Sequence, residues 1–147
     1  MLRRLVLDSN VWLDWLVFAD GAVTAVRQDI EQGRAEVLID APCLDELARV
    51  LAYPLQRWTL DAAGIARALA RCRAYSRTVV SPPVSGLPRC ADGDDQKFIE
   101  LAAGSDAFAL LTRDRALLRM AHRRLPFHIV SPAAYAALPG VEWSRPA

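Results

Sequence analysis

Four acidic residues occupy positions where a parallel sheet would bring them together: Asp8, Glu46, Asp95 and Asp114. Asp8 directly follows the apolar run Leu5–Leu7, which predicts a buried strand that ends in a carboxylate. Glu46 falls early in a predicted helix that follows the strand at 37–39, and Asp95 lies at the start of another predicted helix. Asp114 follows the predicted strand at 108–111. In a right-handed parallel sheet these positions share one edge.

A cluster of carboxylates favours a hard cation. Two like charges about 4 Å apart repel by about 4 kcal/mol at an effective dielectric constant of about 20, so clustered acids are costly without a counter-ion. Carboxylates, waters and phosphate oxygens are the ligands of Mg²⁺ or Mn²⁺, whereas the sequence has no His or Cys pair suited to zinc. Such an ion can activate a water and stabilise charge on a phosphodiester during in-line displacement.

Each acid also has an ordinary structural interpretation. Asp8 and Asp114 are suitable N-caps for the helices that follow them, and Glu46 suits the exposed face of a helix. Asp95 precedes the apolar Phe98 by three residues and so falls on the same, inward face of its predicted helix. A helix cap exposed to solvent has no need to point inward, and it is the joint placement of the acids that favours a site.

Strands and helices alternate along the chain. Apolar runs predict strands at 5–7, 37–39, 78–80, 108–111 and 127–130. Helical spacing predicts helices between them, the first running from about Val11 to Asp20-Gly21, and a short terminal helix after Ser131. The alternation predicts an α/β fold with a parallel sheet covered on both faces.

The composition limits the classes of protein. A chain of 147 residues with 53% hydrophobic content suits one domain, 1–147. The formal charge of +1 gives no strongly basic surface, and the three cysteines include no C-x-x-C pair, which argues against a disulfide framework. No apolar stretch approaches a membrane span. We therefore expect a soluble, cytoplasmic protein without a membrane partner.

Four short motifs occur in order: Leu7-Asp8-Ser9-Asn10, Asp45-Glu46-Leu47, the stretch from Asp95 to Ala102, and Leu111-Thr112-Arg113-Asp114. From about Leu2 to Leu138 the chain resembles the PIN-domain family, in particular the VapC-like toxin components of bacterial type II toxin–antitoxin systems. The resemblance implies a three-layer α/β/α sandwich and a ribonuclease that depends on Mg²⁺ or Mn²⁺. It also implies RNA as substrate and a cognate antitoxin protein as partner.

The resemblance assigns roles residue by residue. The catalytic and metal-binding quartet is Asp8, Glu46, Asp95 and Asp114, and the polar supporting positions are Ser9, Asn10 and Thr112. Ser9 stands where threonine is commoner, a change that keeps the hydroxyl. Because the run Asp92-Gly93-Asp94-Asp95 offers several acids, Asp92 is an alternative ligand or an outer-sphere group.

Other residues have two interpretations each. Arg113 and Arg115 flank Asp114 and could contact RNA phosphate, although a solvated helix start suits them equally. The side chains of Trp12, Trp15 and Leu16 suit the core, or alternatively a groove for an antitoxin helix or for a second copy of the chain in a homodimer.

Two other functions remain open at this point. An aspartate-dependent phosphatase also begins with an aspartate at a strand end, but it carries a second Asp two residues later, where this chain has Asn10. A PIN-like protein that only binds nucleic acid or acts as a scaffold would keep the fold without turnover. The isolated His122 and His128 have no Ser or Cys nucleophile motif beside them, and we expect structural roles for both.

Overall fold

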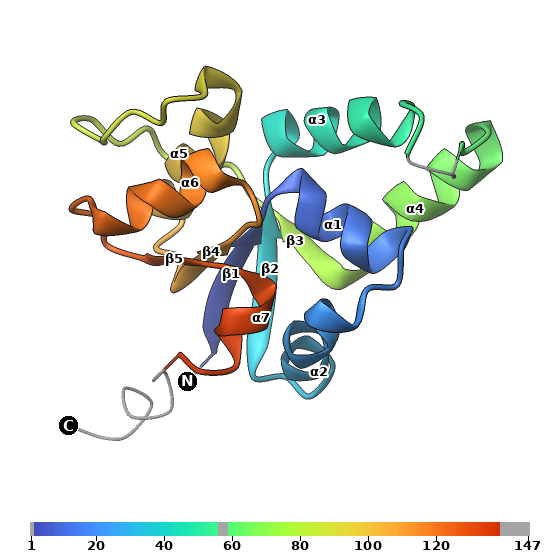
Figure 1. The fold of residues 1–147 in the computed structure, drawn as a ribbon, viewed down its shortest axis with the longest axis horizontal. Helices are drawn as coiled ribbons and strands as arrows, with labels where there is room; N and C mark the ends of the chain where they lie inside the picture. The colour runs from blue at the N-terminus through green and yellow to red at the C-terminus, as the bar shows by residue number, and fades with distance from the viewer. Residues whose placement is uncertain (1, 56–58, 139–147) are drawn as a thin grey trace.

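The structure is a computed structural model that describes residues 2–55 and 59–138. The other positions of the predicted domain, 1, 56–58 and 139–147, lie outside the described residues. A five-stranded parallel sheet of order β3-β2-β1-β4-β5 forms the centre (Figure 1). Its strands are β1 (Arg3–Leu7), β2 (Ala35–Ile39), β3 (Ser76–Thr78), β4 (Ala109–Leu111) and β5 (His128–Val130).

The described helices connect these strands in chain order. They are α1 (Ser9–Leu16), η1 (Gly21–Val23), α2 (Thr24–Glu31), α3 (Ala41–Leu51), α4 (Ala62–Tyr75), η2 (Gly93–Asp95), α5 (Gln96–Gly104), α6 (Arg115–Arg119), η3 (Met120–His122) and α7 (Pro132–Tyr135). None of them is long and apolar enough to span a membrane.

Helices cover both faces of the sheet. Figure 1 shows α1, α2 and α4 on one side and α5 and α6 on the other. In agreement, α2 packs on β2 and α4 on β3, whereas α5 packs on β1 and β4, and α6 on β5. Right-handed crossovers explain this: the chain moves outward from β1 to β3 in one direction, then returns across β1 to β4 and β5 in the other. The predicted α/β/α sandwich is confirmed.

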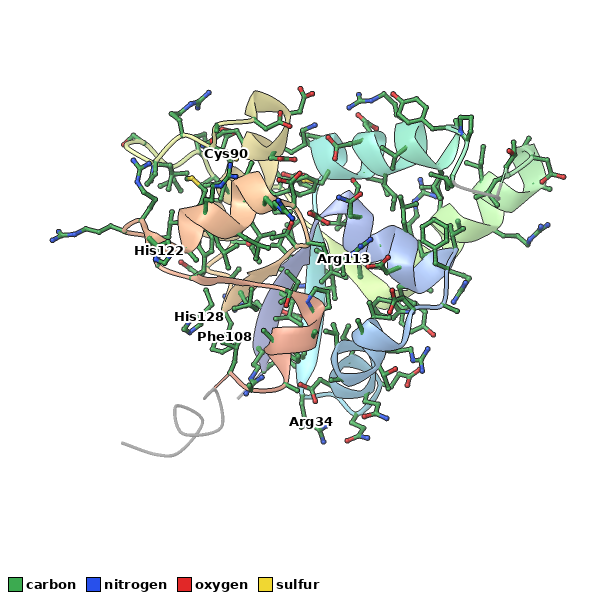
Figure 2. All side chains as sticks on the ribbon, viewed as in Figure 1. Arg34, Cys90, Phe108, Arg113, His122 and His128 are labelled. Carbon is green, nitrogen blue, oxygen red and sulfur yellow. The ribbon has the colours of Figure 1, made fainter. Side chains whose placement is uncertain are left out.

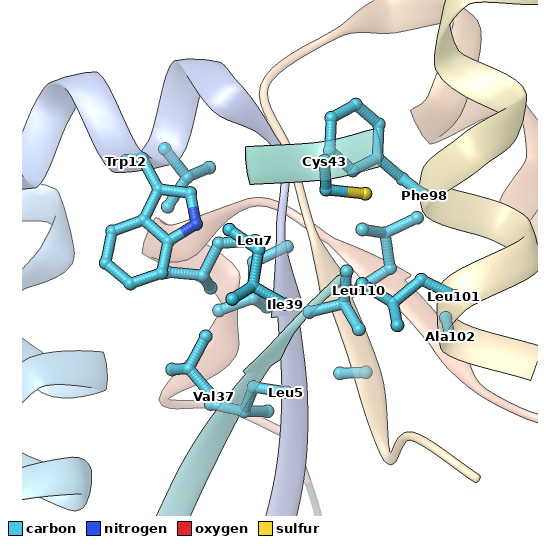
Figure 3. Close-up of a cluster of buried hydrophobic side chains, with 14 of the residues drawn as sticks. Leu5, Leu7, Trp12, Val37, Ile39, Cys43, Phe98, Leu101, Ala102 and Leu110 are labelled. Atoms are coloured by element: carbon cyan, nitrogen blue, oxygen red, sulfur yellow. The ribbon is translucent and has the colours of Figure 1, made fainter. Parts of the chain in front are cut away.

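The core lies on both sides of the central strands. Because helices cover both faces, the central strands read as continuous apolar runs instead of alternating ones. Trp12 and Trp15 stack with ring centroids 5.4 Å apart, and both are buried, as is Leu16. These side chains therefore belong to the core, and they do not form the external groove considered as an alternative. Figure 3 shows strand residues packed between Trp12 and the α5 side chains Leu101 and Ala102; they are Leu5, Leu7, Val37 and Ile39.

Two element boundaries predicted from the sequence were wrong. The third strand covers Ser76–Thr78 instead of 78–80, and Val80 is 98% exposed. Because an edge strand needs no apolar sequence, the prediction from apolar residues placed this strand too far along the chain. The first helix ends at Leu16 instead of near Asp20, because the chain reaches the left-handed conformation at Ala19 (φ 50°).

Candidate functional site

Asp8 and Thr112 meet because their strands pair in register. Leu7 of β1 lies opposite Leu111 of β4, so the next residues, Asp8 and Thr112, are also neighbours. The Thr112 hydroxyl donates a hydrogen bond to Oδ2 of Asp8, and the backbone N–H of Val11 donates to Oδ1 at 3.0 Å. Asp8 is thus both the N-cap of α1 and a buried carboxylate, 3% exposed, at the carboxyl edge of the sheet. The two sequence interpretations of Asp8 are compatible.

Asp114 is linked to the same pair through Thr112. Its backbone N–H donates to the Thr112 hydroxyl oxygen at 2.9 Å, and its own carboxylate caps α6 by accepting from Ala116 N at 2.7 Å. One threonine hydroxyl therefore connects two acids that follow neighbouring strands.

Glu46 reaches this edge from the second turn of α3. Its Oε2 accepts a hydrogen bond from the Ser9 hydroxyl at 2.8 Å, and its Oε1 forms an ion pair with Nζ of Lys97 at 2.5 Å. Ser9 therefore contacts an acid of the predicted quartet, and its supporting role stays a prediction. Asn10, the other supporting residue of that motif, is exposed.

Asp95, and not Asp92, is the more enclosed acid of its run. Oδ2 of Asp95 is buried and has no hydrogen-bond partner in the described part of the chain. Asp92 is exposed, and its carboxylate caps the η2 turn by accepting from Asp94 N at 3.0 Å. The helix register that favoured Asp95 over Asp92 thus agrees with the burial of the two side chains.

The acids influence one another electrostatically. Burial, followed in order of size by the charges of Asp114, Asp92, Asp8 and Glu46, raises the pKa of Asp95 to about 7. Burial, with a smaller contribution from the charge of Asp114, raises the pKa of Asp8 to about 6. Each of these two acids is therefore harder to ionise in the folded chain than in water.

The donor set fits a hard divalent cation, although its members are not drawn into a coordination sphere. Among residues 2–55 and 59–138, no three Asp, Glu, His or Cys side chains are grouped closely enough to hold a metal ion. Within the chain, Asp8, Glu46 and Asp114 instead accept hydrogen bonds from Thr112, Lys97 and Ala116. The unpartnered Oδ2 of Asp95 is what such a site needs, since a buried carboxylate oxygen without a partner is costly.

The two flanking arginines differ. Arg113 forms a two-pronged ion pair with Asp14 of α1, with Nε 2.7 Å from Oδ2 and Nη2 2.8 Å from Oδ1. Asp14 is 2% exposed, so this arginine is held by a buried partner. Arg115 is exposed on the first turn of α6, which leaves it the better of the two for contact with a phosphate.

The histidines lie elsewhere. Figure 2 shows His122 and His128 away from Arg113, and His128 lies beside Phe108, with their rings edge to face at 5.1 Å. This position agrees with the structural role expected for His128.

The fold and the family model agree. A family model described as a PIN domain matches residues 4–116. The chain belongs to the PIN-domain family. PIN domains are in general nucleases and in general use divalent metals.

Solved structures share the fold of this PIN domain at low sequence identity. VapBC2 from Rickettsia felis, bound to a DNA fragment from its promoter, includes a chain with a TM-score of 0.59 and 10% identity, covering 86% of this chain and 96% of that one. PAE2754 from Pyrobaculum aerophilum gives a TM-score of 0.58 with 17% identity, covering 92% and 91%. Among curated proteins, none matches the sequence.

Two partners of the site had no role predicted from the sequence. Lys97 lies inside the third motif, and Asp14 lies within the first predicted helix. Lys97 carried one available signal, because it is the one lysine among 18 basic residues. For Asp14 the signal was a charge within an otherwise apolar helix.

Proposed function

We propose that this PIN domain, residues 1–147, is a metal-dependent endoribonuclease and the toxin of a type II toxin–antitoxin pair. The observation that carries the catalytic part is the buried Oδ2 of Asp95, which has no hydrogen-bond partner among the described residues. In support, burial and the charges of Asp114, Asp92, Asp8 and Glu46 raise the pKa of this carboxyl group. A set of buried, mutually repelling acids is stabilised by a hard cation, and Mg²⁺ or Mn²⁺ suits oxygen donors.

In this proposal the ion is held by all four acids of the quartet: Asp8, Glu46, Asp95 and Asp114. The ion supplies positive charge that makes a water nucleophilic and offsets charge on the phosphodiester. Thr112 fixes Asp8 relative to Asp114, and Ser9 orients Glu46.

The remaining residues act on the RNA. Arg115 is exposed next to Asp114 and is placed to contact a phosphate of the strand, whereas Arg113 mainly holds the turn before α6 through Asp14. The exposed Asp92 adds negative charge at the rim of the site, so in our proposal it acts from the outer sphere.

Cleavage of a defined RNA tests the catalytic part. Purified protein, freed of any antitoxin, should cleave with Mg²⁺ or Mn²⁺ and not in EDTA, and Asp8→Asn and Asp95→Asn should each abolish the activity. The matched control is Asp45→Asn, an exposed acid on α3 beside Glu46, which should cleave like the wild type. Equal cleavage by Asp8→Asn would identify a contaminating nuclease and end the proposal.

The antitoxin part has a separate test. Structural similarity to a chain of VapBC2 supports it. Expression of the wild type should be toxic, expression of Asp8→Asn should not, and co-expression of a small neighbouring gene should relieve the toxicity. Harmless expression of an active wild-type enzyme would instead indicate a housekeeping nuclease.

A further inference from the structure

The ion pair between Lys97 and Glu46 joins the two helices that carry half of the acidic site. Lys97 lies in the first turn of α5, two residues after Asp95, and its Nζ is 2.5 Å from Oε1 of Glu46 on α3. Cys43 of α3 also approaches the backbone of α5, with its Sγ 4.0 Å from the Lys97 carbonyl oxygen. The pair is therefore held in place by the packing of α3 on α5.

Both carboxylate oxygens of Glu46 are occupied by groups of the chain itself. Lys97 holds Oε1 and Ser9 holds Oε2, so Glu46 has formed the contacts that a cation would otherwise provide. Asp95 differs, because its buried Oδ2 has no partner within the described residues. The positive charge of Lys97 thus neutralises one acid of the group and leaves another open.

The partner of Glu46 is a lysine and not an arginine, which affects how easily the ion pair can open. The other basic residues of the chain are arginines. An arginine can bind a carboxylate with two parallel hydrogen bonds, whereas the ammonium of lysine is a compact point charge on a flexible stem. The side chains of Lys97 and Glu46 are 22% and 15% exposed, so the ammonium can move to solvent without entering the core.

We propose that Lys97 is a built-in counter-cation which a divalent metal must displace from Glu46 when it binds. The inference rests on the proposed metal-dependent function. Glu46 is then neutralised by Lys97 in the metal-free chain and becomes available to the metal only when the ion pair opens. Lys97 therefore lowers the affinity of the site for the metal. In the metal-free chain, its positive charge also reduces the electrostatic repulsion between the acids.

Calorimetric titration with Mn²⁺ measures the competition directly. Lys97→Met keeps most of the unbranched side chain and removes its charge, and we expect it to bind Mn²⁺ about tenfold more tightly than the wild type. The matched control is Arg49→Met, which removes an exposed positive charge one turn from Glu46 on the same helix. Screening by solvent should limit its effect to less than about twofold.

Chemical labelling gives a second readout. Because Lys97 is the one lysine of the chain, the side-chain product of an amine-reactive reagent, measured by peptide mass spectrometry, reports on this residue alone. Saturating Mg²⁺ should increase the labelling rate of Lys97 in the wild type, since the ammonium is released, and should leave the rate unchanged in Asp8→Asn.

The proposal requires both results. Unchanged or weaker Mn²⁺ binding by a folded Lys97→Met would show that Lys97 positions Glu46 instead of competing for it, and metal-independent labelling would show that the ion pair stays closed. If Lys97→Met does not fold, Lys97→Gln is tested in the same way. Failure of the wild type to bind Mn²⁺ at all would refute the proposed function itself, and the two failures are thus distinguishable.

Discussion

Replacing Asp8 by Asn separates the stability of this site from its proposed chemistry. The asparagine keeps the size of the side chain and can still accept the hydrogen bond from Val11 N that begins α1. It removes the negative charge, and its amide group then faces the Thr112 hydroxyl, which donates to Asp8 in the wild type. We expect the variant to fold, to lose cleavage, and to lack the pH dependence of stability that the buried Asp8 carboxyl group gives the wild type.

The magnitude follows from the pKa of Asp8. Its rise from 3.8 to about 6 corresponds to a cost on the order of 3 kcal/mol for the ionised form in the folded state. Because the folded pKa lies above the unfolded value, the native state binds more protons between these two values. The free energy of unfolding of the metal-free wild type therefore falls as pH rises through this window, and stays lower above it.

The asparagine variant lacks this loss but weakens the contact with Thr112, worth about 1 kcal/mol. In EDTA, Asp8→Asn should be more stable than the wild type by about 2 kcal/mol at about pH 8, and less stable by about 0.5 kcal/mol at about pH 4. Urea unfolding followed by circular dichroism at both pH values measures this crossover.

Addition of Mn²⁺ completes the test. A ligand that binds only the folded state stabilises it in proportion to the logarithm of its concentration, so the wild type should gain stability and Asp8→Asn should not. A variant that is destabilised equally at both pH values would refute the assignment of Asp8 as a carboxylate strained by burial. So would a wild type whose stability rises with pH in this range.

Three further substitutions test other contacts by urea unfolding. Arg113→Met should cost about 2 kcal/mol, because it leaves the buried Asp14 carboxylate unpaired, and adding Asp14→Asn should recover most of that loss. Gly104→Ala should cost about 2 kcal/mol, because its Cβ would lie 2.6 Å from a backbone oxygen of a facing loop; unchanged stability would show that the loop shifts freely. Tyr135→Phe should cost about 1 kcal/mol, since the hydroxyl donates to Asp29 at 2.7 Å, and a neutral result would mean that water replaces this bond.

The sequence predicted the parts of the site that depend on strand ends. A buried run followed by a polar residue marks the end of a parallel strand, and this predicted that Asp8 and Asp114 share one edge of the sheet. The helix register likewise distinguished Asp95 from Asp92. Both inferences use periodicities that backbone geometry imposes on every chain.

Contacts between helices were not predictable in this way. The approach of Lys97 to Glu46 depends on how α5 packs on α3 across 51 residues of sequence, and no local pattern encodes that packing. The pairing of Arg113 with Asp14 is of the same kind, across 99 residues. Edge strand β3 was misplaced for a related reason, because its position follows from the end of α4 and not from its own polar sequence.

The site therefore consists of two halves with different freedom to move. On the strand side, the Thr112 hydroxyl joins Asp8 to the backbone of Asp114, and main-chain pairing of β1 with β4 fixes that arrangement. On the helix side, Glu46 is held by side-chain contacts with Ser9 and Lys97, and Asp95 has an oxygen without a partner in the part of the chain that the structure describes. Because the acids are not yet grouped for coordination, metal binding has to move the groups with the fewest constraints. Chemical-shift changes on Mg²⁺ addition should then concentrate in α3 and α5, whereas large changes throughout β1 and β4 would contradict a preformed strand half.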